Sequence, residues 1–196
     1  MIYTSTITSA TLRLRESRII ADLLMKEVSD ESWKEAIFER NVLQMNSKES
    51  IKSCSGLLRT RLESTGREIW GMVRDGGPDQ AIQATLACAI KHSRLLGDFM
   101  DIAIRDQRTL FAKKLEYYMW NDYIGSCLGR DPDMPHWSDA TIAKLRSTVF
   151  SMLAEAGYLQ NTRNLLLQNV FVDSQLATYL HDNDEPYVLR CLEVSE

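Results

Sequence analysis

Apolar side chains recur every three or four residues along most of this chain, the pattern of amphipathic α-helices. The first such run extends from Leu12 to Leu24, with Ile20 near its middle. Ahead of it, residues Ile2 to Thr8 alternate Thr or Ser with Ile or Tyr, which favours an extended arm. The chain is therefore expected to begin with an arm that leads into a helix.

Residues that cap helices mark the next elements. Ser29 is expected to open a helix that runs through Trp33 to Phe38, and Asn46 to open another whose apolar face extends to Leu62. Oxygen atoms of such side chains accept hydrogen bonds from the N–H groups that the first turn of a helix leaves free. The first part of the chain thus reads as consecutive short helices.

A mainly apolar segment follows the turn Asp75-Gly76-Gly77-Pro78, whose proline suits the first position of a helix. From Asp79 to about Met100 the residues are apolar around most of the helix circumference, which predicts a central helix packed by neighbours. One more helix is expected from Leu110 to Gly129. These helices would form the middle of the fold.

Two prolines within Arg130–Pro135 indicate a linker, so we divide the chain into a helical domain at residues 1–130 and a mainly helical lobe at residues 131–196. In the second lobe, Ser138 or Asp139 caps an amphipathic helix that ends at Gly157. Apolar triplets at 165–167 and 170–172 flank Gln168-Asn169 and predict a small β-hairpin or a short strand. Short helices follow at 174–180 and 187–194. The expected class is all-α, two-lobed, with this one β element.

The net charge also differs between the two proposed parts of the chain. Residues 1–130 carry 19 Lys/Arg and 17 Asp/Glu, a balance of +2, whereas residues 131–196 carry 4 Lys/Arg and 10 Asp/Glu, a balance of −6. The net charge of −4 argues against nucleic-acid binding by the chain as a whole, but the basic excess in the first domain does not. Two lobes with different surface roles are expected.

No catalytic or metal-binding motif stands out. The chain has neither a phosphate-binding glycine loop nor a nucleophile elbow, and His92, His136 and His181 lack a second histidine at the spacing of a metalloprotease helix. The four cysteines are scattered without a CxxC pair, as expected of reduced, buried thiols. We therefore predict no catalytic residue, no metal site and no cofactor.

The sequence also predicts a cytoplasmic protein that does not insert into a membrane. No apolar stretch approaches the about 20 residues that a spanning helix needs. The N-terminus lacks the basic and apolar regions of a signal peptide.

Basic residues suggest a binding surface instead. Arg13, Arg15 and Arg18 cluster at the start of the first helix. In the helix after Asn46, Lys48, Lys52, Ser55 and Arg59 follow the spacing of one helical stripe, with Arg61 on its flank. Such a row suits successive phosphates of a DNA duplex, because guanidinium and ammonium groups neutralise phosphate and release counterions. The alternative is an ordinary solvated helix face. The predicted DNA-binding residues are Arg13, Arg15, Arg18, Lys48, Lys52, Arg59 and Arg61.

Scattered core-type positions resemble a known family, the A proteins of bacteriophage exclusion (BREX) systems. They include Glu16–Ala21, Trp33 in an acid-rich helix start, Asn41–Gln44, and the C-terminal run from Thr141 to Leu159. The resemblance covers essentially the whole chain. It rests on core positions and contains no catalytic signature.

This resemblance implies a small, non-enzymatic component of a phage-defence operon. It further implies a fold like that of the all-helical antitermination factor NusB, double-stranded DNA as a partner, and other BREX proteins as further candidate partners. Some members carry an inner-membrane label, which the sequence does not support. Two hypotheses follow: a protein that binds DNA mainly through backbone phosphates, or a protein–protein scaffold or regulatory subunit without nucleic-acid contact.

Overall fold

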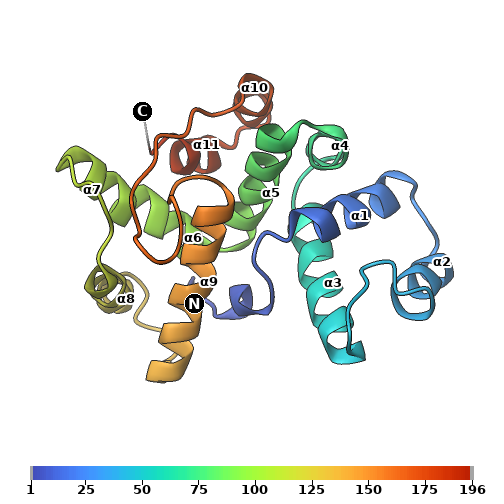
Figure 1. The fold of residues 1–196 in the computed structure, drawn as a ribbon, viewed down its shortest axis with the longest axis horizontal. Helices are drawn as coiled ribbons and strands as arrows, with labels where there is room; N and C mark the ends of the chain where they lie inside the picture. The colour runs from blue at the N-terminus through green and yellow to red at the C-terminus, as the bar shows by residue number, and fades with distance from the viewer. Residues whose placement is uncertain (1, 195–196) are drawn as a thin grey trace.

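The computed structural model describes residues 2–194, and within these residues it contains helices and no strand or sheet (Figure 1). The all-α class is therefore confirmed. The elements in chain order are η1 (Thr6–Ser9), α1 (Leu14–Met25), α2 (Asp30–Lys34), η2 (Glu35–Glu39), α3 (Lys48–Glu63), α4 (Arg67–Asp75), α5 (Pro78–His92), α6 (Arg94–Asp98), η3 (Phe99–Ile104), α7 (Arg105–Thr109), α8 (Tyr117–Arg130), α9 (Asp139–Glu155), α10 (Ser174–Asp182) and α11 (Pro186–Leu192).

The helices surround α5. In Figure 1, α1, α2 and α3 lie on one side of α5, α7 and α8 lie on the other, and α10 and α11 pack near its end. Contacts confirm that α1, α3, α4, α6, α10 and α11 all touch α5. Most of its side chains, from Ala81 to Ile90, are buried. This agrees with the expectation of a central helix that is apolar around most of its circumference.

Several helix ends lie where their capping residues indicated. Ser29 Oγ accepts the Ser32 N–H at 3.2 Å, and Ser138 Oγ accepts the Thr141 N–H at 3.3 Å. The cap of α3 is Ser47, one residue after the expected Asn46. Gly157 follows α9 with a φ of 82°, a left-handed conformation that glycine adopts at little cost.

Two expected helix boundaries are wrong. The central helix was expected to continue to about Met100, but it ends at His92 because Ser93 adopts an extended conformation and caps α6. From Arg94 to Thr109 the chain continues as α6, η3 and α7. The following helix, expected from Leu110, begins only at Tyr117. Residues 110–116 therefore form a non-helical connection.

The N-terminal arm is a buried part of the fold. It contains the turn η1, and Tyr3 and Ile7 are almost fully buried. The Asp131 carboxylate accepts the Ile2 and Tyr3 N–H groups, the latter at 3.0 Å. Asp131 belongs to the proposed linker, so this linker is packed against the beginning of the chain. Residues from both sides of it share one hydrophobic cluster. The division at residue 130 and the likeness to NusB stay predictions.

The expected β-hairpin is absent from the described residues. Residues 165–167 form only isolated bridges, Leu166 with Lys114 and Leu167 with Leu159. The second triplet, 170–172, does not pair with the first. Instead the Gln83 side chain donates to the Phe171 carbonyl at 3.0 Å and accepts the Asp173 N–H at 2.8 Å. The Gln83 side chain of α5 thus forms the hydrogen bonds with this backbone that a paired strand would otherwise have formed.

All four cysteines are free and buried, as expected. Burial raises the pKa of the Cys88 thiol from its ordinary 9.0 to about 11 and that of Cys191 to about 12. An unfolded chain releases these protons near pH 9, whereas the folded chain holds them. The thiols therefore stabilise the fold fully below pH 9 and less as the pH rises toward 11 or 12.

We expect the free energy of unfolding, measured by urea titration, to fall between pH 9 and pH 10.5. Each thiol that ionises only on unfolding contributes up to about 1.4 kcal/mol per pH unit. In Cys88→Ala the fall should be smaller, although the variant is less stable at pH 8. An equal pH dependence in wild type and variant would contradict this account.

Candidate nucleic-acid interface

The predicted basic residues lie around the contact between α1 and α3, which pack against each other (Figure 1). At the start of α1, Arg13 and Arg15 are exposed. The Arg13 guanidinium is half exposed and lies 3.9 Å from the Glu16 carboxylate, at the outer limit of an ion pair. Arg15 donates to the Gln44 side-chain oxygen. This bond ties the start of α1 to the loop that precedes α3.

The first two turns of α3 contribute Lys48 and Lys52, which are both exposed. Neither forms an ion pair with any residue in the described part of the chain. The stripe that they begin is interrupted at Ser55, which is buried with 3% of its surface exposed. Two uncompensated ammonium groups one helical turn apart therefore remain on the surface.

Arg59 lies further along α3 in a more constrained setting. Its guanidinium stacks 4.4 Å from the centre of the Trp33 ring, and its Nε lies 2.7 Å from the Glu63 carboxylate. The stacking fixes the side chain, while Glu63 neutralises part of its charge. Arg59 is thus a partly neutralised cation, in contrast to Lys48 and Lys52.

Arg61 lies in the interior, although we expected it on the flank of the stripe. Only 2% of its surface is exposed. Its guanidinium donates to the carbonyl oxygens of Thr11 at 2.7 Å and Ala10 at 3.0 Å. Burial lowers its pKa to about 10, so it still carries its charge at neutral pH. Arg61 holds backbone and cannot reach a phosphate from this position.

Arg18 is also engaged with backbone. Its guanidinium donates to the Gly76 carbonyl at 2.8 Å and to the Arg74 carbonyl at 3.4 Å, in the turn between α4 and α5. The side chain is half-buried. It therefore fastens α1 to this turn and is not a freely exposed charge.

The structure thus brings four of the seven predicted residues to the surface as available cations: Arg13, Arg15, Lys48 and Lys52. We call these four the α1–α3 basic face. Arg13 and Arg15 lie at the start of α1, and Lys48 and Lys52 lie at the start of α3. Because α1 and α3 pack against each other, the four charges belong to neighbouring elements.

Sequence reasoning missed the residue that positions Arg13. The Glu155 carboxylate, at the end of α9, accepts the backbone N–H groups of Leu12 at 3.1 Å and Arg13 at 3.3 Å. Arg13 itself has a φ of 50°, an uncommon conformation for a residue with a side chain. No local sequence signal connects Glu155 with residues that lie more than 140 positions earlier.

A second charged cluster surrounds Asp98, which is 5% exposed. Its carboxylate accepts the hydroxyls of Tyr3 at 2.7 Å and Tyr187 at 2.8 Å, and Arg94 lies 2.8 Å away. Burial and these bonds to the carboxylate raise the pKa of Tyr3 to about 12. Three donors from separate elements occupy the two oxygens, so the cluster is suited to holding α6, α11 and the N-terminal arm together.

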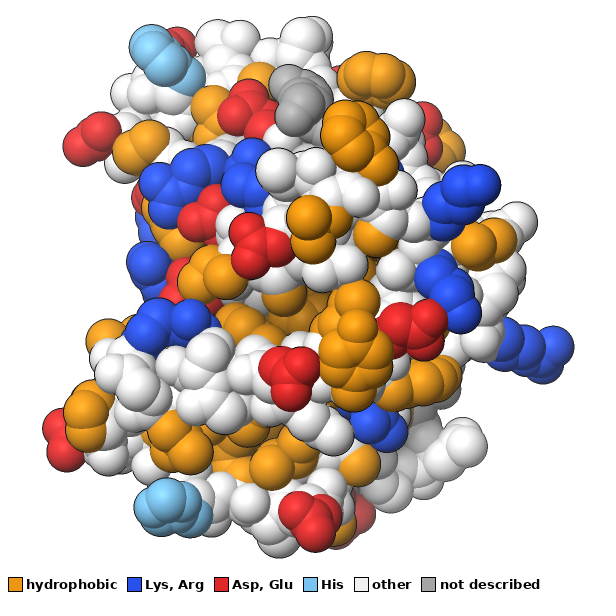
Figure 2. Space-filling view, turned by 90° about the vertical axis from the view of Figure 1, so that its left-hand side faces the viewer, with side chains coloured by type: hydrophobic (Ala, Val, Ile, Leu, Met, Phe, Trp, Pro, Cys, Tyr) orange, Lys and Arg blue, Asp and Glu red, His pale blue; other side chains and the backbone are white. Residues whose placement is uncertain are grey.

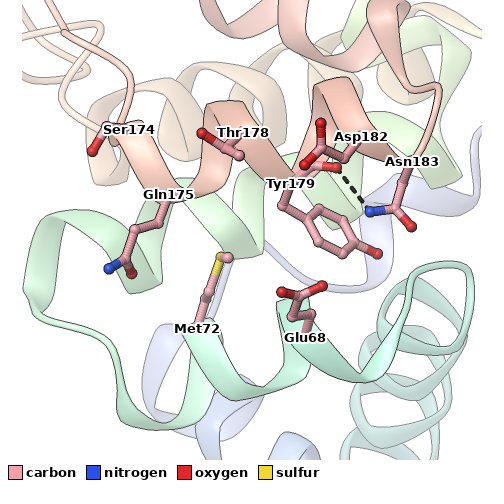
Figure 3. A pocket seen from close by; sticks show the side chains of 8 residues that line it. All are labelled: Glu68, Met72, Ser174, Gln175, Thr178, Tyr179, Asp182 and Asn183. Atoms are coloured by element: carbon pink, nitrogen blue, oxygen red, sulfur yellow. Dashed lines mark hydrogen bonds between the residues drawn. The ribbon is translucent and has the colours of Figure 1, made fainter.

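A polar pocket between α4 and α10 offers another surface hollow (Figure 3). Glu68 and Met72 face it from α4, and Gln175 and Tyr179 from α10. The Tyr179 hydroxyl is engaged by the Gly66 N–H at 3.2 Å. No lining residue shown in Figure 3 forms a nucleophile–base pair, so its arrangement does not suggest catalysis.

In residues 2–194, no group of three or more His, Cys, Asp or Glu side chains is placed to hold a metal ion. No helix in this range is long and apolar enough to cross a membrane.

Known proteins share this architecture. The crystal structure of an uncharacterized protein from Magnetospirillum magneticum superposes with a TM-score of 0.93 at 45% sequence identity, and the match covers 100% of both chains. The class is therefore that of an all-helical protein whose fold is already known from a solved structure.

Curated relatives give the family. The BREX protein BrxA of Paramagnetospirillum magneticum is 46% identical over 193 residues, which covers 98% of this chain and 97% of the relative. BREX protein BrxA of Escherichia coli O9:H4 is 32% identical over 182 residues, covering 93% and 85%. The BrxA family model matches residues 1–184. The chain belongs to the BrxA family of BREX phage-defence proteins.

The contacts of the arginines predict different effects on stability. Arg61→Ala should lower the free energy of unfolding by about 3 kcal/mol, because buried carbonyls lose their donors and a cavity remains. Arg18→Ala should cost about 1 kcal/mol, and the exposed Arg15→Ala less than about 0.5 kcal/mol. Urea unfolding of the three variants gives the order. Equal losses for Arg61→Ala and Arg15→Ala would show that Arg61 is not an internal anchor.

Proposed function

We propose that this BrxA-family protein is a non-enzymatic accessory component of its BREX system, acts in the cytoplasm, and binds double-stranded DNA through backbone phosphates at the α1–α3 basic face. The single observation that carries this proposal is the exposure of four cations at the starts of α1 and α3, two helices that pack together; within the described chain only Arg13 among them approaches a carboxylate, that of Glu16 at 3.9 Å. Exposed cations on neighbouring elements repel one another, and a row of phosphates relieves that repulsion while releasing counterions.

The scaffold under these charges supports the proposal because it fixes their positions. Lys48 and Lys52 project from adjacent turns of a helix capped by Ser47, and Arg13 is held by Glu155 through the backbone. A surface that is organised before binding loses less entropy when it meets a rigid duplex. Phosphate contacts of this kind carry little sequence information, so we expect weak or no sequence preference.

The acidic residues of the C-terminal part are compatible with DNA binding at the α1–α3 basic face. Several of them serve the fold itself: Asp131 and Glu155 accept backbone N–H groups, Asp173 caps α10, and Glu185 pairs with Lys91. Asp131, Asp173 and Glu185 therefore do not pair with the cations of the α1–α3 basic face, whereas Glu155 places one negative charge beside the backbone of Arg13. The remaining acidic surface would be repelled by DNA and would orient the protein on it.

The rival hypothesis is a scaffold or regulatory subunit that touches no nucleic acid. The net charge of −4 favours it. The two hypotheses make opposite predictions for DNA binding at low salt, so one titration separates them.

We expect a labelled random-sequence duplex to bind the wild-type protein, with fluorescence anisotropy as the readout. Four phosphate contacts predict a slope of about −3 to −4 in a plot of log K against log salt concentration. The double charge reversal Lys48→Glu with Lys52→Glu should weaken binding at least about tenfold at low salt and make the slope shallower by about 2. The loss should be equal for unrelated duplexes.

The matched control is Lys144→Glu with Arg163→Glu. Both residues are exposed, and neither forms an ion pair within the described chain. This double variant has the same net charge as the first, yet it changes α9 and the loop after it. An equal loss in both variants would show that only overall charge matters. Absence of any wild-type binding at low salt would sink the DNA hypothesis and favour the scaffold.

A further inference from the structure

The connection between α7 and α8 exposes an unusual group of hydrophobic side chains. Leu110 is 71% exposed, Phe111 91%, Tyr117 48% and Tyr118 60%. Elsewhere in residues 2–194, only Ile2 and Phe171 are large hydrophobics exposed to a similar degree. Single exposed apolar side chains are ordinary, whereas a group within one short segment marks an interaction surface. We call residues 110–118 the α7–α8 segment.

The turn that ends α7 leaves the side chains of Leu110 and Phe111 exposed. Phe111 has a φ of 53°, a conformation that costs energy for a bulky side chain. The Phe111 N–H bonds to the Arg108 carbonyl at 2.9 Å, and the Ala112 N–H to the Gln107 carbonyl at 2.9 Å. These bonds end α7 and hold the chain in the turn. An observed strained residue of this kind is a recognised sign of a functional site.

The far side of the α7–α8 segment is anchored as well. The Leu115 N–H donates to the Leu165 carbonyl and the Lys113 carbonyl accepts the Leu167 N–H, both at 3.0 Å. The Leu115 side chain is buried. The exposed rings are therefore carried by a segment that is fastened at both ends, as a binding surface organised in advance would be.

The charge beside Phe111 is positive. A pocket next to this ring is lined by Arg105 and Arg108 together with Phe111, Ala112 and Val194. Arg105 is paired with Asp101, whereas within residues 2–194 the Arg108 guanidinium bonds to neutral oxygens, those of the Asn169 side chain and the Gln168 backbone.

Lys113 adds a second exposed cation with no ion pair in the described chain. Lys114 is paired with Glu116 at 2.8 Å. Arg108, before Phe111 in the chain, and Lys113, after it, thus carry positive charge that no ion pair within residues 2–194 compensates. A carboxylate next to an apolar side chain would complement this combination.

A hollow with an apolar floor continues from this segment. It lies between η3–α7 and α8, with Ile102, Ala103 and Met119 among the lining residues, while Asp106 and Asp122 also line it. Figure 2, which looks onto the side that carries α7 and α8, shows hydrophobic side chains in a hollow at the centre of this face. The apolar surface is therefore wider than the exposed pair Leu110 and Phe111.

We propose that the α7–α8 segment docks a protein partner through a segment that places an acidic side chain against Arg108 and Lys113 and apolar side chains over Leu110 and Phe111. In Figure 1, α7 lies at the end of the molecule opposite α2 and α3, so this surface stays free while DNA occupies the α1–α3 basic face. Apolar contact around a central aromatic residue is the usual centre of a protein interface. Leucine beside the ring favours protein over a base-stacking site, which needs aromatic faces.

The test uses the full-length protein and a displayed library of random linear peptides as the probe. We expect selection to enrich peptides that combine Asp or Glu with Leu, Phe or Trp. The best synthetic peptide, measured by anisotropy, should bind Phe111→Ser and Lys113→Glu at least about tenfold more weakly than wild type. Replacing the acids of the peptide by their amides should weaken binding to wild type in the same way.

Matched controls keep the result specific. Phe171→Ser changes an equally exposed phenylalanine outside the α7–α8 segment and should bind the peptide as wild type does. The Lys48→Glu, Lys52→Glu double variant should also bind it normally, which separates this surface from the DNA hypothesis. Thermal unfolding of each variant confirms that it is folded.

Several outcomes overturn the proposal. These are a library without enrichment, enriched peptides that lack acids, and peptides that bind Phe111→Ser as tightly as wild type. A single-stranded oligonucleotide that binds wild type and loses affinity in Phe111→Ser, in place of acidic peptides, would assign the segment to nucleic acid.

Discussion

The guanidinium group of Arg61 is the contact on which the arrangement of this protein depends. The buried guanidinium donates hydrogen bonds to the carbonyl oxygens of Ala10 and Thr11. The Glu155 carboxylate accepts the N–H groups of the next two residues. Arg61 from α3 and Glu155 from α9 thus each bind two backbone groups, in four consecutive residues from Ala10 to Arg13. Removing Arg61 would leave the Ala10 and Thr11 carbonyls inside the fold without donors, and removing the exposed Glu155 would free the N–H groups of Leu12 and Arg13, so either change would disturb that crossing.

That crossing sets the direction in which α1 leaves the arm, and with it the placement of Arg13 and Arg15 beside α3. The same arm is secured again at its start, where Tyr3 bonds to Asp98 and its N–H to Asp131. A short stretch with little secondary structure therefore links three helices that are distant in sequence. Arg61 is buried by these contacts, whereas Arg13 and Arg15 remain exposed, although all three are arginines.

Local chemistry made much of the helical pattern predictable. Ser29, Ser138 and Gly157 act through neighbours within four residues, so the sequence shows them directly. The sequence predicts Arg61 on the exposed flank of the stripe because helical spacing does not reveal which flank a neighbour covers, and its acceptors are about 50 residues away. The prediction of a hairpin at 165–172 is wrong for a similar reason, because the backbone of Phe171 and Asp173 bonds to the side chain of Gln83 on α5. Spacing therefore anticipated Lys48 and Lys52 on the surface, but it gave no means of separating exposed from internal arginines.

The position of the N-terminal arm has a consequence for biosynthesis. Its partners Asp131 and Glu155 lie 129 and 143 residues further along the chain, so they emerge from the ribosome long after the arm does. Until then Tyr3 lacks the Asp131 carboxylate that accepts its N–H group, and Leu12 and Arg13 lack that of Glu155. Contacts between residues so far apart in the sequence form slowly. The N-terminal arm is therefore among the last parts of the chain to be fixed, whereas α1 packs on α3, α4 and α5, which all emerge before Asp131 and Glu155.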